Sequence, residues 1–335
     1  MASTSDAPLS PETINRLEAA VPPALAFLAG MQLEIFSAMA SGPRKAADIA
    51  VSVGAPADRI ERLLRALVLT DLVVMDEDRF ANSAEAAAFL VKGEPGYVGG
   101  THELTSDIWF ADMQTAKSVR SGRPAAQYDF SHMETEALTA FLRGLRTYAT
   151  KTGAALAETF DFSRCGSVID IGGGSGAALF GLIDANPSMR GTLFELAPVA
   201  EAARPMIAET NYADRISIEV GDILASAPAG RHDAALLRAV VQVLGPEDAA
   251  KAIANACQCL SPGGSIYITG AGILDDGGMS PASAVYLDLT LMNFYPQGAS
   301  RTVSQHFRWL SDAGCTDCRA TRLKSGSTVI SAIKA

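Results

Sequence analysis

The sequence predicts an α/β protein in which a doubly wound parallel sheet follows a mostly helical domain. From residue 166 onward, short apolar runs alternate with helical stretches, a pattern typical of a sheet covered by helices on both faces. One of these runs, Val-Ile-Asp-Ile at 168–171, leads directly into a glycine loop at 172–176 and then into a helix from Ala177. Before residue 160 the apolar side chains recur at helical spacing, which predicts a separate helical region.

Two helices and a hairpin are predicted in the first hundred residues. Apolar residues at helical spacing predict helices over Leu25–Ala40 and Ala57–Leu72. Two short runs, Val73–Met75 and Arg79–Ala81, flank an acidic turn at 76–78 and predict a hairpin. Helices followed by a small hairpin are typical of a winged-helix module.

Winged-helix modules commonly bind DNA, but the charge of this one disfavours that function. Residues 1–100 hold 8 Lys and Arg against 13 Asp and Glu, and the whole chain has a formal net charge of −10. Binding to nucleic acid needs a basic face, and so does binding to an anionic membrane surface. We therefore expect the module to bury its apolar helices in a homodimer, with a DNA-binding regulator as the weaker alternative.

The second half of the chain is predicted to alternate between strands and helices. The predicted strands are Ser167–Ile171, Gly191–Phe194, Ile216–Val220, Ala234–Arg238, Ser265–Thr269 and Thr328–Ile333. The segment Asp275–Gly298 interrupts this pattern where a substrate-covering insertion is expected. The expected organisation is a flexible tail (1–11), a winged-helix dimerisation domain (12–100), a helical linker and substrate-pocket region (101–160) and a cofactor-binding catalytic domain (161–335).

The composition predicts a well-packed globular protein, since 48% of the 335 residues are hydrophobic and only 19% are charged. No apolar run reaches the length of a membrane helix and the first residues do not resemble a signal peptide, so we expect a cytoplasmic protein. The five cysteines are an odd number, and Cys315-x-x-Cys318 has no second pair or nearby histidines to complete a zinc site. We therefore expect ordinary thiols and no metal.

The glycine loop predicts a nucleotide-type cofactor, because only glycine lets the backbone turn so tightly and come so close to a ligand. Gly172-x-Gly174-x-x-Ala177 matches the dinucleotide fingerprint, and Glu195 lies about twenty residues further on, where an acid binds ribose hydroxyls. Three further details favour S-adenosylmethionine over a nicotinamide. The first is Asp170, placed to orient bound water or the cationic methionine end, and the second is Asp222 in Gly-Asp-Ile at 221–223, placed to accept from the adenine amino group. The third is the segment Leu260–Thr269, which resembles the corresponding loop and strand of class I methyltransferases.

The chain resembles the family of plant-type and bacterial small-molecule O-methyltransferases, which includes caffeate and hydroxyneurosporene methyltransferases. The motifs that carry the resemblance are Asp170–Gly176, Phe194–Pro198, Gly221–Ile223, Leu237–Gln242 and Gly298–Thr302. The resemblance implies a Rossmann-like class I methyltransferase fold, S-adenosylmethionine as the cofactor and a homodimer formed through the N-terminal domain. It also implies a set of cofactor-binding residues. These are Gly172 and Gly174 at the methionine end, Glu195 and Leu196 at the ribose, Asp222 and Ile223 at the adenine, and Arg238 beside the cofactor.

One departure from the family's pattern decides the expected chemistry. The family carries a catalytic histidine after the fourth strand, where this chain has Gln242, and Ala271 and Ser300 stand where two supporting carboxylates are expected. None of these three side chains can take up a proton, whereas a positioned base contributes roughly 10²–10⁴ in rate. O-methylation of a phenol needs such a base and is therefore disfavoured. Gln242 is expected to position the acceptor instead.

The retained cofactor motifs and the missing bases predict methyl transfer to an acceptor that gives up no proton. The preferred reaction is S-methylation of a small thioether carboxylate, because the chain resembles the S-methyltransferases that act on 4-methylthio-2-hydroxybutyrate in dimethylsulfoniopropionate synthesis. Two alternatives stay open. One is O-, N- or C-methylation of an already activated acceptor, and the other is a methyltransferase-like protein repurposed for hydroxylation, decarboxylation or cyclisation.

Candidate acceptor-binding residues lie in two regions. The helical segment at 141–148 carries Arg143, which could bind a carboxylate, and Tyr148, which stands at a substrate-contacting position of the family. The other candidates are His102, Trp109 and Tyr128 before that segment and Asp288, Met292, Asn293 and Tyr295 in the late insertion. The alternative role of these candidates is packing in the core, and for Arg143 it is a place on a solvated helix face. His132 and His306 are expected at the surface.

Overall fold

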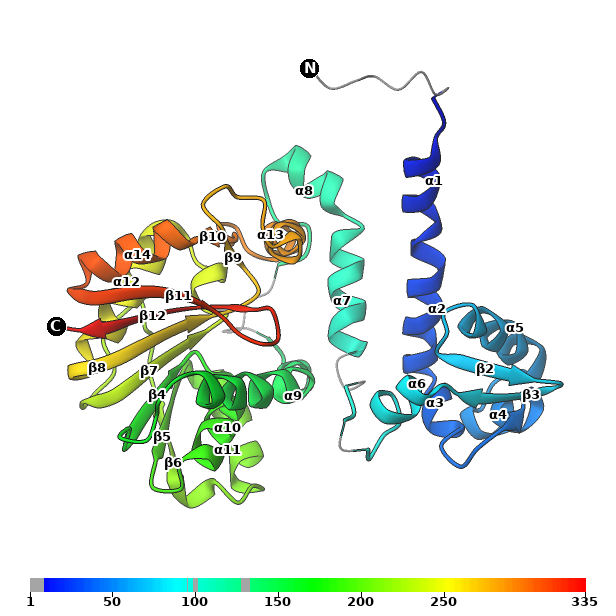
Figure 1. Cartoon of the computed structure of the whole chain (residues 1–335), viewed down its shortest axis with the longest axis horizontal. Coiled ribbons are helices and arrows are strands. Elements are labelled where there is room, and N and C mark those ends of the chain that lie inside the picture. Colours follow the sequence, from blue (N-terminus) through cyan, green and yellow to red (C-terminus); the bar gives the residue numbers. More distant parts are fainter. Residues whose placement is uncertain (1–8, 95, 99–101, 128–132) are drawn as a thin grey trace. The chain divides into compact units, whose positions relative to one another are not determined.

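The computed structural model describes residues 9–94, 96–98, 102–127 and 133–335. The chain divides into two compact units, Met1–Ser106 and Asp107–Ala335, and helix α7 (His102–Asp112) crosses the division. Figure 1 shows the elements of each unit. Over the described ranges, every helix is too short or too polar to pass through a lipid bilayer.

The N-terminal unit combines short helices with a small antiparallel sheet. Its strands run in the order β1-β3-β2, with bounds β1 (Arg44–Lys45), β2 (Val73–Asp76) and β3 (Arg79–Asn82). The helices are α1 (Glu12–Ala19), α2 (Val21–Gln32), α3 (Ile35–Ala38), α4 (Ala46–Val53), α5 (Ala57–Val68) and α6 (Ala84–Phe89). The pairing of β2 with β3 confirms the predicted hairpin.

Two of the predicted helices were too long. The single helix expected over Leu25–Ala40 is broken between α2 and α3, because Glu34 adopts a left-handed conformation with φ 54°. Helix α5 ends at Val68, before Asp71, which also has a positive φ of 61°. Positive φ is uncommon for residues other than glycine, so the apolar spacing that continues past both residues did not reveal the breaks.

Helix α1 buries no residue in the described unit. The apolar side chains of Ile14, Leu17, Val21 and Leu25 are between 49% and 61% exposed. They are spaced three or four residues apart, so they lie on one face of the α1–α2 segment. A contiguous exposed apolar face of this kind marks a protein interaction surface.

The C-terminal unit is built on a seven-stranded sheet in the order β11-β12-β8-β7-β4-β5-β6. The strands are β4 (Ser167–Ile171), β5 (Arg190–Glu195), β6 (Ile216–Val220), β7 (His232–Arg238), β8 (Leu260–Thr269), β11 (Cys315–Arg322) and β12 (Thr328–Lys334). Neighbours from β6 to β8 are parallel, and β12 is antiparallel to both β8 and β11. All six predicted strands are confirmed. Because the parallel strands share one direction, their carboxyl ends meet at one edge of the sheet.

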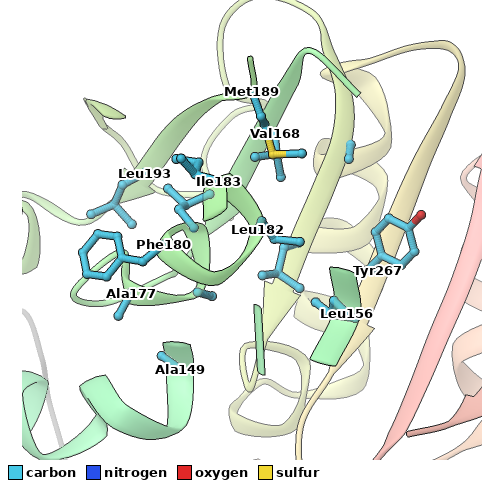
Figure 2. Packing of buried hydrophobic residues seen from close by; sticks show 14 of the residues in the cluster. Ala149, Leu156, Val168, Ala177, Phe180, Leu182, Ile183, Met189, Leu193 and Tyr267 are labelled. Atoms are coloured by element: carbon cyan, nitrogen blue, oxygen red, sulfur yellow. The ribbon is translucent and has the colours of Figure 1, made fainter. Parts of the chain in front are cut away.

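Helices cover both faces of this sheet, as doubly wound topology requires (Figure 1). They are α9 (Thr135–Thr159), α10 (Ala177–Ala185), α11 (Ala197–Ala208), α12 (Pro246–Gln258) and α14 (Val303–Asp312). Helices α8 (Thr115–Ser121) and α13 (Ala282–Phe294) pack against each other. Residues of α9, α10 and α11 form one core cluster with the sheet, and residues of α12 and α14 form another. Figure 2 shows Phe180, Leu182 and Ile183 of α10 in the first cluster with Val168 and Leu193 of the sheet.

Close contact between α9 and α10 fixes the position of the glycine loop. A Cβ atom on Gly153 of α9 would lie 2.0 Å from the carbonyl oxygen of Ala178, and one on Gly181 of α10 would lie 2.4 Å from the nitrogen of Ala154. Only glycine allows the two helix backbones to approach so closely. Since α10 begins directly after the glycine loop, α9 holds that loop from one side.

The edge strand β11 was not predicted from the sequence. Only Cys315 among its eight residues is buried, and its run Cys-Thr-Asp-Cys-Arg-Ala-Thr-Arg lacks the apolar alternation of a half-buried strand. It is held by pairing with β12, which itself pairs with β8. The strand therefore forms because a neighbour offers hydrogen bonds, a cause that local pattern does not show.

Candidate functional site

The candidate site lies at the carboxyl ends of β4, β5, β6 and β7. Gly172, Gly174 and Gly176 in the loop after β4 all have positive φ, between 61° and 70°. A Cβ atom on Gly172 would lie 2.6 Å from Cγ2 of Val240, and the Gly172 N–H donates to the carbonyl oxygen of Phe194 at 2.9 Å. The loop thus needs glycine for its conformation and for the closeness of the segment after β7.

Asp170 lies directly beneath this loop. Its side chain is fully buried, and neither carboxylate oxygen has a hydrogen-bond partner among the described residues. A Cβ atom on Gly173 would lie only 2.2 Å from Oδ2, so the carboxylate fills the space under the loop. Burial raises the pKa of Asp170 to about 6, although the positive charge of Arg238 opposes that rise. A buried carboxylate without partners is suited to receive a cationic or hydrogen-bond-donating ligand.

Glu195, the last residue of β5, is held by two backbone amides. Its Oε1 accepts a hydrogen bond from the N–H of Gly174 and its Oε2 accepts one from the N–H of Leu196, both at 2.8 Å. Burial raises its pKa to about 7, against the effect of these two hydrogen bonds. Each oxygen keeps a second lone pair with which it can accept from a ligand hydroxyl.

The segment after β6 adds the third side of the site. Gly221 packs against the ring of Phe194, because a Cβ atom there would lie 2.4 Å from it. Asp222 is exposed, and its Oδ1 accepts from the N–H of Leu224 at 2.8 Å. The carbonyl oxygen of the half-buried Ile223 accepts from Nδ2 of Asn255 at 2.7 Å. The structure therefore brings Asp170, Glu195 and this segment together from three adjacent strands, along with Arg238 at the end of β7.

Gln242 lies in a 3-10 turn, Val241–Val243, that follows β7. Its side-chain Oε1 accepts from the N–H of Gly272 at 3.1 Å, and its main-chain oxygen accepts from the N–H of Ala299 at 2.9 Å. A Cβ atom on Gly270 would lie 2.6 Å from the same Oε1. The amide is thus fixed by its oxygen, and its Nε2 donors have no partner in the described part of the chain.

Asp288 and Ser300 are hydrogen-bonded to each other beside the turn that holds Gln242. The N–H of Ser300 donates to Oδ1 of Asp288 at 2.6 Å, and the Ser300 hydroxyl donates to the carbonyl oxygen of Ala284 at 2.7 Å. The guanidinium of Arg301 donates to the carbonyl oxygens of Leu244 and Gln297, both at 2.9 Å. Asp288 therefore connects α13 to the segment that holds Gln242.

Asn293 lies in a buried polar network. It is fully buried, and its Nδ2 donates to Oδ1 of Asp112 at 3.1 Å and to Oγ1 of Thr115 at 2.9 Å. Thr290 donates to the other Asp112 oxygen at 3.0 Å. These contacts join α13 to α7 and to the start of α8, so the side-chain amide of Asn293 serves packing between helices.

The other predicted acceptor residues are dispersed. On α9, Arg143 and Tyr148 are exposed, Tyr148 by 54%. Trp109, Met292 and Tyr295 are half-buried, and burial raises the pKa of Tyr295 to about 12. Tyr128, His132 and the side chain of His102 lie outside the described residues.

The prediction that His306 lies at the surface was wrong. His306 is only 2% exposed, and its ring packs edge-on against that of Trp309 with the centroids 5.6 Å apart. Its Nδ1 atom lies 2.8 Å from the carbonyl oxygen of Thr302. The helical spacing of His306 and Trp309 places both on the buried face of α14, which explains the difference.

Two residues that shape the site were not among the predictions. Gly272 could have been noticed, because Gly-Ala-Gly at 270–272 directly follows a strand and such glycines allow a close approach. Asn255 lies on α12 without any distinctive local pattern, and only the fold brings it to Ile223. Throughout the described ranges, His, Cys, Asp and Glu side chains do not gather in groups of three or more that could hold a metal ion.

Comparison with known proteins identifies two matching families. The O-methyltransferase domain family matches residues 107–316, and the O-methyltransferase dimerisation domain family matches residues 23–92. The chain is 28% identical over 314 residues to the 3-hydroxy-5-methyl-1-naphthoate 3-O-methyltransferase of Streptomyces sahachiroi, covering 92% of this chain and 90% of that protein.

Two further relatives are similar over most of their length. The 8-amino-8-demethylriboflavin N,N-dimethyltransferase of Streptomyces davaonensis is 30% identical over 297 residues, which cover 84% of each chain. The solved structure of mitomycin 7-O-methyltransferase MmcR superposes with a TM-score of 0.81 at 26% identity, covering 97% of both chains.

Proposed function

The chain belongs to the O-methyltransferase family and is an S-adenosylmethionine-dependent methyltransferase, and from this premise we propose that it methylates a small acceptor without a general base. The acceptor's reacting atom has a free lone pair and no proton that must leave first. The observation that carries this proposal is the hydrogen bond from the Gly272 N–H to Oε1 of Gln242. It fixes a side chain that cannot take up a proton at the position where the family has its catalytic histidine.

The residues at the strand ends fit S-adenosylmethionine. The partnerless carboxylate of Asp170 would balance the positive charge of the methionine end, and Glu195 would accept from the ribose hydroxyls. Asp222 and Ile223, on the next strand end, would bind the adenine. When bound, the cofactor supplies an electrophilic methyl group. The chain's own contribution is then to hold the acceptor in line with that methyl and to exclude water.

Gln242 is suited to position an acceptor rather than to activate it. Its Oε1 already accepts from the Gly272 N–H, whereas its two Nε2 donors are without a partner among the described residues and are free to bind a ligand. A donor at this position can hold a neighbouring oxygen of the acceptor, but it cannot remove a proton from a phenol. Ser300 and Ala271, at the other two positions where the family has acids, do not replace the base, since neither side chain ionises.

The first candidate reaction is S-methylation of a thioether carboxylate of the 4-methylthio-2-hydroxybutyrate type, toward dimethylsulfoniopropionate. A thioether sulfur attacks through its lone pair and loses no proton, so alignment alone is sufficient. The sulfonium product is a cation that an aromatic face stabilises, and Tyr148 and Tyr295 are the aromatic candidates. Arg143 is the candidate for the carboxylate.

N-methylation is a second candidate. An amine nitrogen also attacks through its lone pair, and an ammonium proton leaves to water only afterwards. The specific observation in its favour is the 30% identity to an N,N-dimethyltransferase over 84% of this chain. Both candidates share the absence of a base, and they differ only in the acceptor.

The experiment is an acceptor screen in which formation of S-adenosylhomocysteine is measured by mass spectrometry. Matched thioether carboxylates, amines and phenols are each incubated with the protein and S-adenosylmethionine. We expect turnover with a thioether or an amine and at least 100-fold slower turnover with phenols. Phenols as the best acceptors would overturn the proposal. Binding of S-adenosylmethionine without transfer to any class would favour the repurposed alternative instead.

We also propose that the protein is a homodimer formed through its N-terminal unit. Residues 23–92 match an O-methyltransferase dimerisation domain, and the exposed apolar face of Ile14, Leu17, Val21 and Leu25 would be covered by a second copy. The formal charge of −10 supports a small-molecule enzyme over a nucleic-acid-binding or membrane-bound one. A cytoplasmic location remains part of this proposal.

A further inference from the structure

Two buried cysteines of the C-terminal unit lie in contact, one on α12 and one on β11. Cys257, in the last turn of α12, and Cys315, the first residue of β11, are separated by 58 residues in sequence, yet their Sγ atoms are 3.0 Å apart. Their exposed fractions are 0% and 5%. A disulfide has its sulfur atoms about 2.05 Å apart, so an approach of about 1 Å would join these two.

The surroundings favour ionisation of Cys315 over that of Cys257. Cys315 lies opposite Lys334 in the β11–β12 register. The hydrogen bond from Cys257 lowers the pKa of Cys315 against the effect of burial, and the positive charge of Lys334 lowers it further. The same hydrogen bond and burial raise the pKa of Cys257. Elsewhere the pair is enclosed by apolar side chains of α12, α14 and the sheet. Thiolate is the reactive form, so Cys315 is the nucleophile of the pair.

A third cysteine, Cys318, connects the buried pair to solvent. Cys318 is half-exposed and packs against the same cluster. The β11–β12 register shifts between Thr316 and Arg319, and Asp317 has a positive φ of 52°. A register shift of this kind bends a strand, and two cysteines at Cys-x-x-Cys spacing can exchange disulfide bonds with each other.

We propose that Cys257 and Cys315 are an oxidisable dithiol, that hydrogen peroxide is the oxidant, and that Cys318 is the thiol that hydrogen peroxide reaches first. The Cys318 sulfur attacks the peroxide, forming sulfenic acid and releasing one water. The Cys315 thiolate attacks that sulfur and expels hydroxide, which with the Cys315 proton gives a second water. The Cys257 sulfur then attacks Cys315, a disulfide forms, and Cys318 leaves as a thiolate and takes the Cys257 proton. Two thiols lose two electrons and two protons, and one peroxide becomes two waters.

The disulfide would join two segments that both begin at the candidate site. Helix α12 starts at Pro246, three residues after the turn that holds Gln242, and β11 follows α14, which starts at Val303, two residues after Arg301. Their far ends meet at Cys257 and Cys315. A link that closes a loop of this length restricts the unfolded chain, so we expect the oxidised protein to melt about 5 °C or more above the reduced one. This inference does not depend on the identity of the methyl acceptor.

The test uses the full-length protein, fully reduced, freed of reductant and treated with increasing hydrogen peroxide. Free thiols are then blocked with N-ethylmaleimide, and non-reduced peptides are mapped by mass spectrometry. We expect the five free thiols to fall to three, with a Cys257–Cys315 peptide that dithiothreitol abolishes. Retention of all five thiols, oxidation confined to Cys318, or a final link between Cys315 and Cys318 would overturn the proposal.

Two variants test the route. Cys318→Ser should slow formation of the Cys257–Cys315 link at least tenfold, because the buried pair then lacks its exposed partner. Cys259→Ser is the matched control, since Cys259 is buried nearby but its thiol donates to the carbonyl oxygen of Ala256. The control should oxidise at the wild-type rate. An unchanged rate in Cys318→Ser would overturn the role of Cys318, and the mapping of the wild-type protein tests the pair without any variant.

Discussion

The carboxylate of Glu195 accepts a hydrogen bond from the backbone N–H of Gly174, and this contact joins the end of β5 to the glycine loop that follows β4. The other oxygen of the same carboxylate accepts from Leu196. One buried side chain thus orders two backbone segments and also keeps lone pairs for a ligand. The shape of the candidate site therefore depends on the two acceptor oxygens of a single side chain.

We expect Glu195→Gln to weaken S-adenosylmethionine binding at least tenfold, or about 1.4 kcal/mol. The glutamine amide places a donor where one of the two backbone N–H groups needs an acceptor, so the loop loses a hydrogen bond. Isothermal titration calorimetry measures the change. The control is Glu201→Gln, whose side chain is 71% exposed and 3.6 Å from Arg204. An equal loss of affinity in the control would argue against a specific role for Glu195.

Cofactor affinity should rise with pH between about 5 and 8. In the free protein burial raises the pKa of Asp170 to about 6 and that of Glu195 to about 7, so both are partly protonated below neutrality. A cationic ligand favours the ionised carboxylates, and binding should therefore release protons. Calorimetry in buffers of different ionisation enthalpy measures that release. An affinity independent of pH over this range would contradict the assignment of Asp170 to the cationic end.

The carboxyl groups of Asp170 and Glu195 also predict that the stability of the cofactor-free protein falls as the pH rises. A raised pKa means that the folded state binds more protons than the unfolded state between about pH 4 and 7. This contribution to stability is present at low pH and is lost as the pH rises through the folded pKa values. For Asp170, the rise of its pKa to about 6 corresponds to about 3 kcal/mol. Asp170→Asn should therefore raise the melting temperature at pH 8 while it weakens cofactor binding, and a decrease in both would contradict the prediction.

Gln242→Ala should keep turnover of the natural acceptor within about tenfold of wild type, with unchanged cofactor affinity. Removing a positioning donor costs about the free energy of one hydrogen bond, on the order of 1 kcal/mol, whereas removing a base costs roughly 10²–10⁴ in rate. Gln242→His restores the family's residue and should not accelerate the reaction. Steady-state kinetics measure both variants. A loss of several orders of magnitude in Gln242→Ala, with binding intact, would contradict transfer without a base.

Local pattern and motif were sufficient to predict six of the seven strands of the large sheet, and the loop and strand end that the structure brings together at Gly174 and Glu195. The apolar run at 168–171 predicts a strand and the glycines after it predict a tight loop, and both predictions use local sequence alone. The contact of Asn293 with Asp112 joins residues 181 apart, and no local pattern reports it. Glu34 breaks a helix in an apolar context, and β11 depends on its neighbour β12. The buried network of Asn293 and the edge strand β11 were therefore decided by tertiary contacts, and the helix break by the backbone conformation of Glu34.

Gly153→Ala should destabilise the C-terminal unit by about 1–3 kcal/mol, because the added methyl group would lie 2.0 Å from the carbonyl oxygen of Ala178. Helices α9 and α10 would have to separate, and the glycine loop at the start of α10 would move with them. We therefore expect a weaker cofactor affinity together with a lower melting temperature. Differential scanning calorimetry with and without S-adenosylmethionine measures both effects. Thr147→Ala, an exposed change on the same helix, is the control and should alter neither.

Leu17→Asp should convert the proposed homodimer into a monomer without unfolding the N-terminal unit. Leu17 is 61% exposed on a helix that buries nothing within its own unit, so a charge there costs little in a single chain. Against a second apolar face the same charge would be buried without a partner, which costs several kcal/mol. Light scattering after size-exclusion chromatography measures the mass, and circular dichroism verifies the helices. An unchanged dimer would place the interface on another surface, since an aspartate is not tolerated in an apolar contact.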